Sequence, residues 1–401
     1  MKKEETGLNL RFGVVCSLYW ILWAASTVFL VPILRQKGMA DGQIGFLFSV
    51  RSLAAICFSP VIASFLDRHV KIQIKYVLML LAGLNILNVL FFQYTRPNFW
   101  QMVLIFVVLG GTTNTMLPLH SSLAMKFQKP GRTIQFNLGR GAGSVTYAVA
   151  ALALGKMVGE TNLNLAFTFQ IVMDILTMLV LVRFPDYEAE NASQTEKRQE
   201  EAHSNFYIIR KYPWFFLFLI ASAFAYVGYN MCSSFLVDII VDRGGNNADL
   251  GIASFILGMS ELPAALFYRK LEKKFGICNL VMMSAVFGVI KMLAMYLSPN
   301  VFCICLAQTL QILGNGLYWQ ASVYYVKAVI PGADQVKGQS LTTVFSVNIG
   351  AILGSICSGQ MLQYFDVNGL LLFGTLCCGV GVVIMGVSMR QSKKHLLAID
   401  A

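Results

Sequence analysis

Charged residues are scarce in this chain. Only 13% of its 401 residues are Asp, Glu, Lys or Arg, whereas a soluble domain carries roughly 25%. Hydrophobic residues make up 56%, which argues against two or three soluble domains. A transmembrane helix needs about 20 predominantly apolar residues, and backbone groups in lipid must bond internally. Long apolar runs without two-residue alternation therefore predict an all-α membrane protein.

Histidine and metal-ligand patterns are also rare. Of the four histidines, one, His120, falls inside a predicted span. The nine cysteines lie in or beside apolar segments and show no metal-ligand spacing, so we interpret them as reduced thiols that pack as small apolar groups. We expect no metal and no cofactor. Without a cluster of His and Asp residues or a Gly-rich phosphate loop, a membrane enzyme or an ATP-driven pump is not favoured.

One long polar stretch divides the chain. Residues 185–211 read PDYEAENASQTEKRQEEAHSNFYIIRK, and such a segment buries too little apolar area to order itself. Phe206, Ile208 and Ile209 are its possible anchors. The predicted domains are an N-terminal six-helix bundle at 1–184, a cytoplasmic linker at 185–212, a C-terminal six-helix bundle at 213–390 and a cytoplasmic tail at 391–401.

Apolar runs separated by short polar or Pro- and Gly-containing connections predict twelve transmembrane helices. Their expected ranges are 10–34, 43–66, 73–95, 99–124, 133–158, 162–184, 213–240, 248–270, 276–297, 300–327, 338–362 and 367–389. The first run is too long for a signal-peptide core and lacks a small-residue cleavage site, so we expect an uncleaved first helix.

Lys and Arg residues alternate between the two sides of these helices. Of the 31, 23 fall on the side of the N-terminus, 5 on the other side and 3 inside helices. Positive residues collect in cytoplasmic connections. The asymmetry predicts a multi-pass protein of the cell membrane with both termini and the linker in the cytoplasm. It also accounts for the net charge of +11 without a nucleic-acid partner.

The two halves repeat weakly. The second helix begins DGQIGFLF and contains Pro60, and the eighth begins NADLGIAS and contains Pro263. A six-helix offset is typical of two parallel repeats about an axis along the membrane normal. Small residues recur at four-residue spacing in the fifth and eleventh helices, for example at Gly139 and Gly143 and at Gly350 and Gly354. This spacing predicts close helix packing.

These features resemble the major facilitator superfamily, whose loop after the second helix carries an acid-base pair matched here by Asp67-Arg68. A narrower resemblance is to the branch of lactose permease and the phenylpropionate permeases. Arg140-Gly-Ala-Gly-Ser in the fifth helix, Glu261-Leu-Pro in the eighth and Lys291 in the ninth carry that resemblance. It implies two pseudo-symmetric six-helix bundles and alternating access, with Asp67 and Arg68 in the conformational loop motif.

The chain departs from that pattern at two places. In the fourth helix the family's Pro-x-x-carboxylate reads Pro118-Leu-His120-Ser121, so the acid is missing. In the tenth helix the positions that resemble the permease's Lys, His and Glu read Gln308, Gln311 and Gly314. The missing residues therefore leave open whether this chain recognises a sugar and whether it uses the family's coupling route. Gln311 and Gly314 are not expected to carry the coupled proton.

Ionisable side chains inside the membrane are costly and by default functional. Six are candidates for such a position: Arg51, Arg140, Asp174, Asp238, Glu261 and Lys291, of which Asp238 lies within one turn of a helix end and is equally consistent with an interfacial position. In the first half the alternatives are a structural ion pair that uses Asp174, or a cationic cavity. In the second half Glu261 and Lys291 could form a structural pair or a coupling pair. We take Glu261, Lys291 and Asp174 as the proton-coupling candidates.

Polar and aromatic residues at similar depths are the candidates for solute binding. They are Arg140, Tyr147, Arg51, His120, Ser121, Tyr229, Asn230, Asn315 and Trp319. The leading prediction is a monomeric proton-coupled symporter of a small organic solute, either an organic, aromatic or sugar acid or a sugar, embedded in the lipid bilayer. The alternatives are a uniporter or exporter of a neutral sugar or nucleoside, and a non-transporting sensor or lipid-translocating relative. The sequence does not distinguish import from export.

Overall fold

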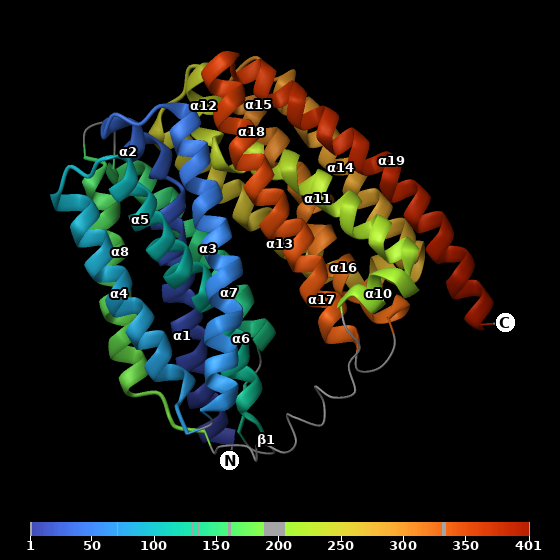
Figure 1. The fold of residues 1–401 in the computed structure, drawn as a ribbon, viewed down its shortest axis with the longest axis horizontal. Helices are drawn as coiled ribbons and strands as arrows, with labels where there is room; N and C mark the ends of the chain where they lie inside the picture. Colours follow the sequence, from blue (N-terminus) through green and yellow to red (C-terminus); the bar gives the residue numbers. More distant parts are fainter. Residues whose placement is uncertain are drawn as a thin grey trace. The chain divides into compact units, whose positions relative to one another are not determined.

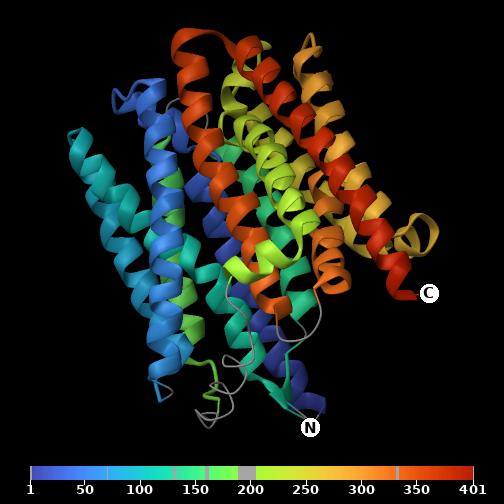
Figure 2. The same ribbon diagram turned by 45° about the vertical axis from the view of Figure 1, so that its right-hand side comes forward.

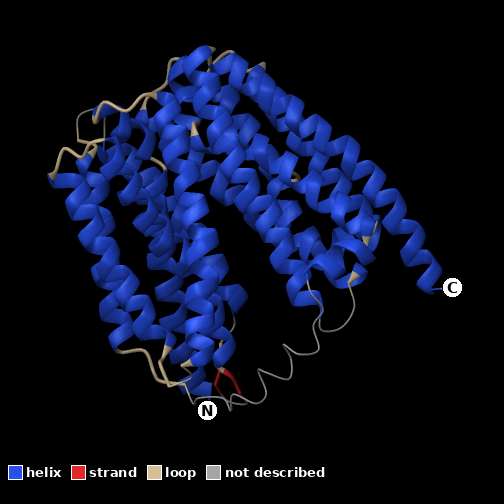
Figure 3. Ribbon diagram, viewed as in Figure 1, coloured by secondary structure: helices blue, strands red, loops and turns tan. Residues whose placement is uncertain are grey.

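Helices form almost all of the chain that is described in a computed structural model of the protein (Figure 3). The described residues are 2–69, 71–129, 132–134, 136–158, 162–187, 205–330 and 334–400. Within them, 12 helical segments are long and apolar enough to cross a membrane. The predicted all-α membrane fold is therefore confirmed. The short strands β1 (Gln128–Lys129) and β2 (Arg132–Thr133) pair as an antiparallel hairpin.

The chain forms two compact units. Unit 1 takes Met1–Ala192 with Asn246–Met259, and unit 2 takes Ser193–Gly245 with Ser260–Ala401. The helical elements of the first half are α1 (Lys2–Thr27), α2 (Leu30–Gln36), α3 (Asp41–Arg68), α4 (Ile74–Tyr94), α5 (Phe99–Leu109), the π-helix η1 (Gly110–Asn114), α6 (Thr115–Lys126), α7 (Phe136–Val158) and α8 (Asn164–Val182).

The second half also consists of helical elements. They are α10 (Asn205–Lys211), α11 (Pro213–Ser234), α12 (Leu236–Asp242), α13 (Asn247–Phe275), α14 (Ile277–Tyr296), α15 (Val301–Gln308), the 3-10 helix η2 (Thr309–Ile312), α16 (Asn315–Val329), α17 (Gln335–Thr343), the π-helix η4 (Val344–Ile349), α18 (Gly350–Tyr364) and α19 (Val367–Asp400). Helix α13 contributes its first residues to unit 1 and the rest to unit 2.

The polar segments differ in part from their prediction. Helix α1 begins at Lys2 and α19 continues to Asp400, where charged tails were expected. Residues 188–204 of the predicted linker lie outside the described residues. The last part of that segment is helical rather than unstructured, because α10 buries Ile208 in the apolar core of unit 2.

Small residues bring helices close together in both units, as their spacing predicts. A Cβ added at Gly143 of α7 would lie 2.1 Å from the Trp20 ring of α1. A Cβ added at Gly354 of α18 would lie 2.9 Å from a backbone or side-chain atom of α11. Only glycine allows such approaches. Figure 2 shows α18 beside α11 in unit 2.

The fourth span of each half is interrupted at mid-length. The π-helix η1 follows α5, and the 3-10 helix η2 follows α15. In the first half, Gly110 allows α3 to approach the start of η1 closely, because a Cβ there would lie 2.1 Å from the Arg51 carbonyl oxygen. Such breaks in the i to i−4 pattern often occur at functional sites. Both breaks carry amide side chains, Asn114 and Gln311, which face buried cations as described below.

Candidate solute and coupling sites

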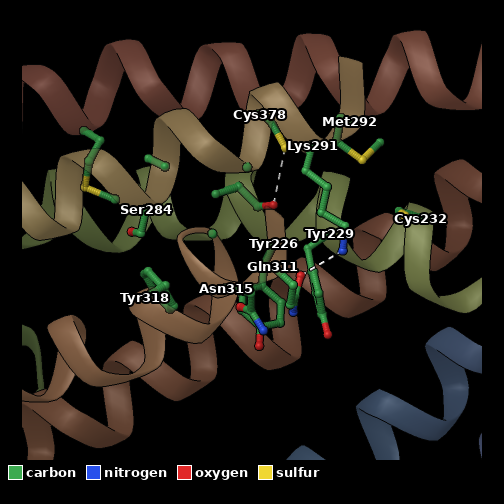
Figure 4. Close-up of a pocket in the computed structure, with 15 residues that line it drawn as sticks. Tyr226, Tyr229, Cys232, Ser284, Lys291, Met292, Gln311, Asn315, Tyr318 and Cys378 are labelled. Carbon is green, nitrogen blue, oxygen red and sulfur yellow. Dashed lines mark hydrogen bonds between the residues drawn. The ribbon is translucent and has the colours of Figure 1, made fainter. Parts of the chain in front are cut away.

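A small cavity of about 50 Å³ lies inside unit 2 between α11, α14, the start of α16 and α19. Figure 4 shows its lining, in which one cation, Lys291, lies among tyrosine, amide, thiol and methionine side chains. The polar and aromatic members are Tyr226, Tyr229, Ser284, Lys291, Gln311, Asn315 and Tyr318. The cavity has room for water and for solute hydroxyl groups, and its one charged lining residue is Lys291.

Lys291 is joined to an acid through an amide. Its side chain is only 5% exposed, and its Nζ donates to Gln311 Oε1 at 2.8 Å. Gln311 Nε2 in turn donates to Glu261 Oε1 at 3.4 Å. Among the described residues Lys291 forms no salt bridge, so Gln311 bridges the two charged residues in place of the direct pair that the sequence suggested.

Aromatic rings complete the surroundings of Lys291. Its Nζ lies 5.7 Å from the Tyr229 ring centre, within the range of a cation–π interaction. Tyr226 packs against Tyr229 at 5.2 Å and against Trp319 at 6.3 Å. Of the second-half solute candidates, Tyr229 and Asn315 line the cavity and Trp319 contacts it through Tyr226.

Asn230, by contrast, serves helix packing. Its Oδ1 accepts a hydrogen bond from Ser355 Oγ at 3.0 Å, which joins α11 to α18. It is not among the residues that line the cavity. The structure therefore gives Asn230 a structural contact where the sequence predicted solute binding.

In unit 1, Arg51 of α3 is a buried cation that is 7% exposed. Its guanidinium donates to Asn114 Oδ1 at 3.2 Å and to Thr113 Oγ1 at 3.3 Å, both in η1. A third, longer bond of 3.5 Å reaches the Ser26 carbonyl. The guanidinium also lies 4.9 Å from the Trp23 ring centre. All of these partners are neutral, so the structural ion pair considered for Arg51 is wrong.

The aromatic residues of α1 connect Arg51 to two other candidates. The Tyr19 ring lies 5.0 Å from His120, and the Trp20 ring lies 6.3 Å from Tyr147. His120 is 2% exposed, and its two ring nitrogens have no hydrogen-bond partner among the described residues. Three candidates of the first half, Arg51, His120 and Tyr147, thus lie beside aromatic residues of α1.

The remaining candidates of the first half lie apart from that cluster or serve their own helix. Ser121 Oγ donates to the Leu117 carbonyl at 3.4 Å, within α6. Arg140 is exposed on α7, and Asp67 and Arg68 are exposed at the end of α3. Asp174 on α8 is fully buried and accepts a hydrogen bond from Asn85 on α4 at 2.6 Å. The pairing of Asp174 with an arginine is therefore wrong.

Amide side chains are the residues that sequence reasoning missed. Asn85 and Asn114 were not singled out, and Gln311 was regarded only as a lost position. The sequence feature that could have identified them is an Asn or Gln in the middle of an apolar span. An unpaired amide is costly there, so a hydrogen-bond partner is required. Within the described part of the chain, no group of three or more His, Cys, Asp or Glu residues is placed to hold a metal ion.

Curated relatives resemble the chain over nearly its full length. The maltose permease of Geobacillus stearothermophilus is 22% identical over 394 residues, which is 97% of this chain and 96% of the permease. The putative nucleoside transporter YegT of Escherichia coli (strain K12) is 22% identical over 411 residues, which is 95% of this chain and 93% of that transporter. These identities are low, but the coverage is nearly complete in both directions.

Solved structures and a family model agree with this resemblance. A mutant of the nucleoside transporter NupG superposes with a TM-score of 0.80 at 16% identity, covering 96% of this chain and 99% of that one. At such an identity the likeness concerns the fold. The model described as the MFS_1 like family matches residues 14–373. The resemblance to the major facilitator superfamily is thus confirmed, and the chain belongs to the MFS_1 like family, as a multi-pass membrane transporter of small solutes.

Proposed function

We propose that the protein is a proton-coupled symporter of a small, ring-bearing neutral solute, a sugar or a nucleoside, and that Glu261 carries the coupled proton. The observation that carries the proposal is the hydrogen-bonded series Lys291–Gln311–Glu261 in unit 2. It joins an acid to the cavity through a side chain that lines the cavity. A gradient of protons then supplies the energy for accumulation.

Gln311 links solute binding to proton binding. Its amide can offer one NH₂ group to Glu261 and one oxygen to Lys291. A solute hydroxyl that accepts the hydrogen bond of Gln311 Nε2 removes that donor from Glu261. A carboxylate that loses a donor holds its negative charge less well, so it takes up a proton more readily. By linkage, the proton in turn changes the affinity for solute by the same factor.

A neutral solute fits the chemistry of the two units better than an acid. Arg51, the buried cation that would attract a carboxylate, is already occupied by neutral partners and a tryptophan ring. The cavity of unit 2 offers hydroxyl and amide groups with tyrosine rings, which suit the hydroxyl groups of a neutral solute. Two relatives are described as a maltose permease and a putative nucleoside transporter.

The solute class is tested by binding and by uptake. Purified protein is screened by thermal shift against sugars, nucleosides and organic acids, and each hit is then offered in radiolabelled form to proteoliposomes with an inward proton gradient. We expect stabilisation and uptake with a sugar or a nucleoside. Uptake of carboxylates alone would overturn the neutral-solute proposal. Lipid scrambling without uptake of any solute would favour a lipid-translocating protein.

The proton carrier is tested with Glu261→Gln. This variant keeps the shape of the side chain, but glutamine cannot bind and release the coupled proton. Accumulation of solute against its gradient should therefore be abolished, while solute exchange continues. Glu272→Gln, on the same helix outside the cavity, is the matched control and should accumulate solute as the unmodified protein does. Continued uphill accumulation by Glu261→Gln would exclude Glu261 as the coupling residue.

Arg140 is proposed as a solute contact from unit 1. An arginine fork can hold two hydroxyls or a carboxylate, which a lysine cannot do. Arg140→Lys keeps the charge and should weaken solute binding at least about tenfold, which corresponds to about 1.4 kcal/mol. Isothermal titration with the solute found above measures the change. Unchanged affinity in both Arg140→Lys and Arg140→Ala would make Arg140 a structural cation.

We further propose that the protein lies in the cell membrane with both termini in the cytoplasm, on the charge asymmetry of its connections. Cys57 is exposed, so labelling requires a background without reactive native cysteines. In that background Ser193→Cys should react with an impermeant maleimide only after the cells are opened. Asn246→Cys, at an exposed connection on the opposite side, should react in intact cells. The reverse pattern would invert the topology.

A further inference from the structure

A second acid lies buried between α4 and α8 in unit 1. Figure 1 shows these two helices side by side. Asp174 of α8 and Asn85 of α4 are both 0% exposed. Gln170 lies one turn before Asp174 on the same helix and is also buried. These three polar side chains are therefore buried on two neighbouring membrane helices.

The hydrogen bonds of this pair are incomplete when the acid is ionised. Asn85 Nδ2 donates to Asp174 Oδ2 at 2.6 Å. Asp174 Oδ1 and Asn85 Oδ1 have no hydrogen-bond partner among the described residues, and neither has Gln170 Nε2. Two acceptor oxygens are therefore left without a donor on two side chains that already contact each other. Unpaired buried acceptors of this kind are uncommon in native structures.

No cation of the neighbouring helices balances Asp174. Helices α1, α4 and α7 pack against α8. Their nearest relevant cations are engaged elsewhere or exposed: Arg11 of α1 donates to the Arg183 carbonyl, Lys75 of α4 binds Asp186 and the Phe184 carbonyl, and Arg140 and Lys156 of α7 are exposed. Among the described residues Asp174 forms no ion pair, and its one polar partner is Asn85.

The tyrosine of α1, Tyr19, is also engaged, since its hydroxyl donates to the Thr113 carbonyl. The tyrosines of α4, Tyr76 and Tyr94, are exposed near its two ends. An ionised carboxylate without a cation, placed in the interior of a membrane bundle, is strongly disfavoured. A neutral acid removes that cost.

We propose that Asp174 is a proton-binding site, in which the carboxyl group holds a proton at neutral pH and pairs with the Asn85 amide as an acid–amide pair. A proton on Oδ1 gives that oxygen a donor, and Asn85 Oδ1 is the acceptor on the side chain already in contact. One proton therefore satisfies both orphaned oxygens. The site is separate from Glu261, and the protonated pair joins α4 to α8 without a charge.

The proton on Asp174 makes the stability of the protein depend on pH. An exposed aspartate in the unfolded chain, with a pKa of about 3.9, has released its proton at neutral pH. The folded protein then binds one more proton than the unfolded chain. The free energy of unfolding therefore falls as the pH rises, for as long as the folded protein keeps that proton.

Infrared spectroscopy tests the proposal directly, since a protonated carboxyl has a C=O stretching band that a carboxylate lacks. The full-length protein is compared with Asp174→Asn at neutral pH, in sodium-containing and sodium-free buffer. We expect one protonated-carboxyl band that disappears in Asp174→Asn and persists in Glu261→Gln. Absence of the band, its survival in Asp174→Asn, or its loss when sodium is added would overturn the proposal.

Two further measurements keep the proposal testable if Asp174→Asn folds poorly. Asn85→Ala retains the acid and removes its partner, so the band should remain but move to the frequency of a less hydrogen-bonded acid. An unmoved band would exclude Asn85 as the partner. The thermal unfolding midpoint should fall more steeply from neutral to alkaline pH in the unmodified protein than in Asp174→Asn. Parallel pH profiles would overturn the proton assignment.

Discussion

The two units hold a buried cation in the same way but connect it differently. In unit 1 Arg51 binds Asn114 of the interrupted fourth span, and in unit 2 Lys291 binds Gln311 of the corresponding interruption. Only in unit 2 does the amide also reach a carboxylate, Glu261. In both units, an amide side chain at the interruption of the fourth span stabilises a buried cation. Among the described residues, the cation of unit 2 is thus linked to an acid and Arg51 of unit 1 is not.

The choice of cation agrees with that difference. Arginine remains charged under all ordinary conditions, whereas lysine changes its protonation readily when it is buried. Arg51 and its neutral partners therefore make a fixed positive site. Lys291 is linked to an acid, Glu261, through Gln311, which is the arrangement that the proposed coupling requires.

The largest effect is expected from removal of the two cations. Lys291→Met leaves Glu261 without its linked positive charge and Gln311 Oε1 without its donor. The lost charge interaction adds to the cost of about 1–3 kcal/mol for an unsatisfied buried polar group. Arg51→Met leaves no acid behind among its described partners, so its cost should be smaller. The thermal unfolding midpoints of the purified variants measure both.

The double variant Lys291→Met with Glu261→Gln is the control for this prediction. Removing both charges should recover a large part of the stability lost in Lys291→Met alone, as a double-mutant cycle would show. If the two losses simply add, Lys291 and Glu261 are not coupled through Gln311. The distinction drawn between the units would then fail.

An intermediate effect is expected from replacement of the two amides. Gln311→Leu removes the hydrogen-bond acceptor of the buried Lys291 ammonium and one donor to Glu261, and an unsatisfied buried polar group costs about 1–3 kcal/mol. Asn114→Leu deprives only Arg51, which keeps Thr113 and its other contacts. Gln311→Leu should also reduce the number of protons moved per solute, which the ratio of pH change to labelled uptake measures. Equal ratios in both variants would contradict the bridging role of Gln311.

The smallest effect is expected from the aromatic rings. The Arg51 guanidinium lies 4.9 Å from the Trp23 ring and Lys291 Nζ lies 5.7 Å from the Tyr229 ring. Cation–π contacts contribute about 0.5–2 kcal/mol, most strongly with tryptophan. Trp23→Leu should therefore lower the unfolding midpoint more than Tyr229→Leu does. Tyr229→Phe, which keeps a ring over Lys291, should be nearly neutral. The reverse order would indicate that packing, not charge, governs both sites.

The sequence by itself determined the twelve spans and the superfamily. Apolar runs of membrane length force backbone groups to bond within helices, and the spans observed follow the predicted ranges closely. The spacing of small residues such as Gly143 and Gly354 also predicted where helices approach each other closely. The buried ionisable residues stood out because each is costly in lipid.

The tertiary structure alone decided which groups these ionisable residues meet. Side chains on different helices come together by crossing angle and depth, which the spacing within one helix does not define. For that reason Asp174 faces Asn85 rather than an arginine, and Gln311 lies between Lys291 and Glu261. Hydrogen-bonded contacts form only over about 3 Å, so a small change of helix rotation would have given other partners to the same sequence.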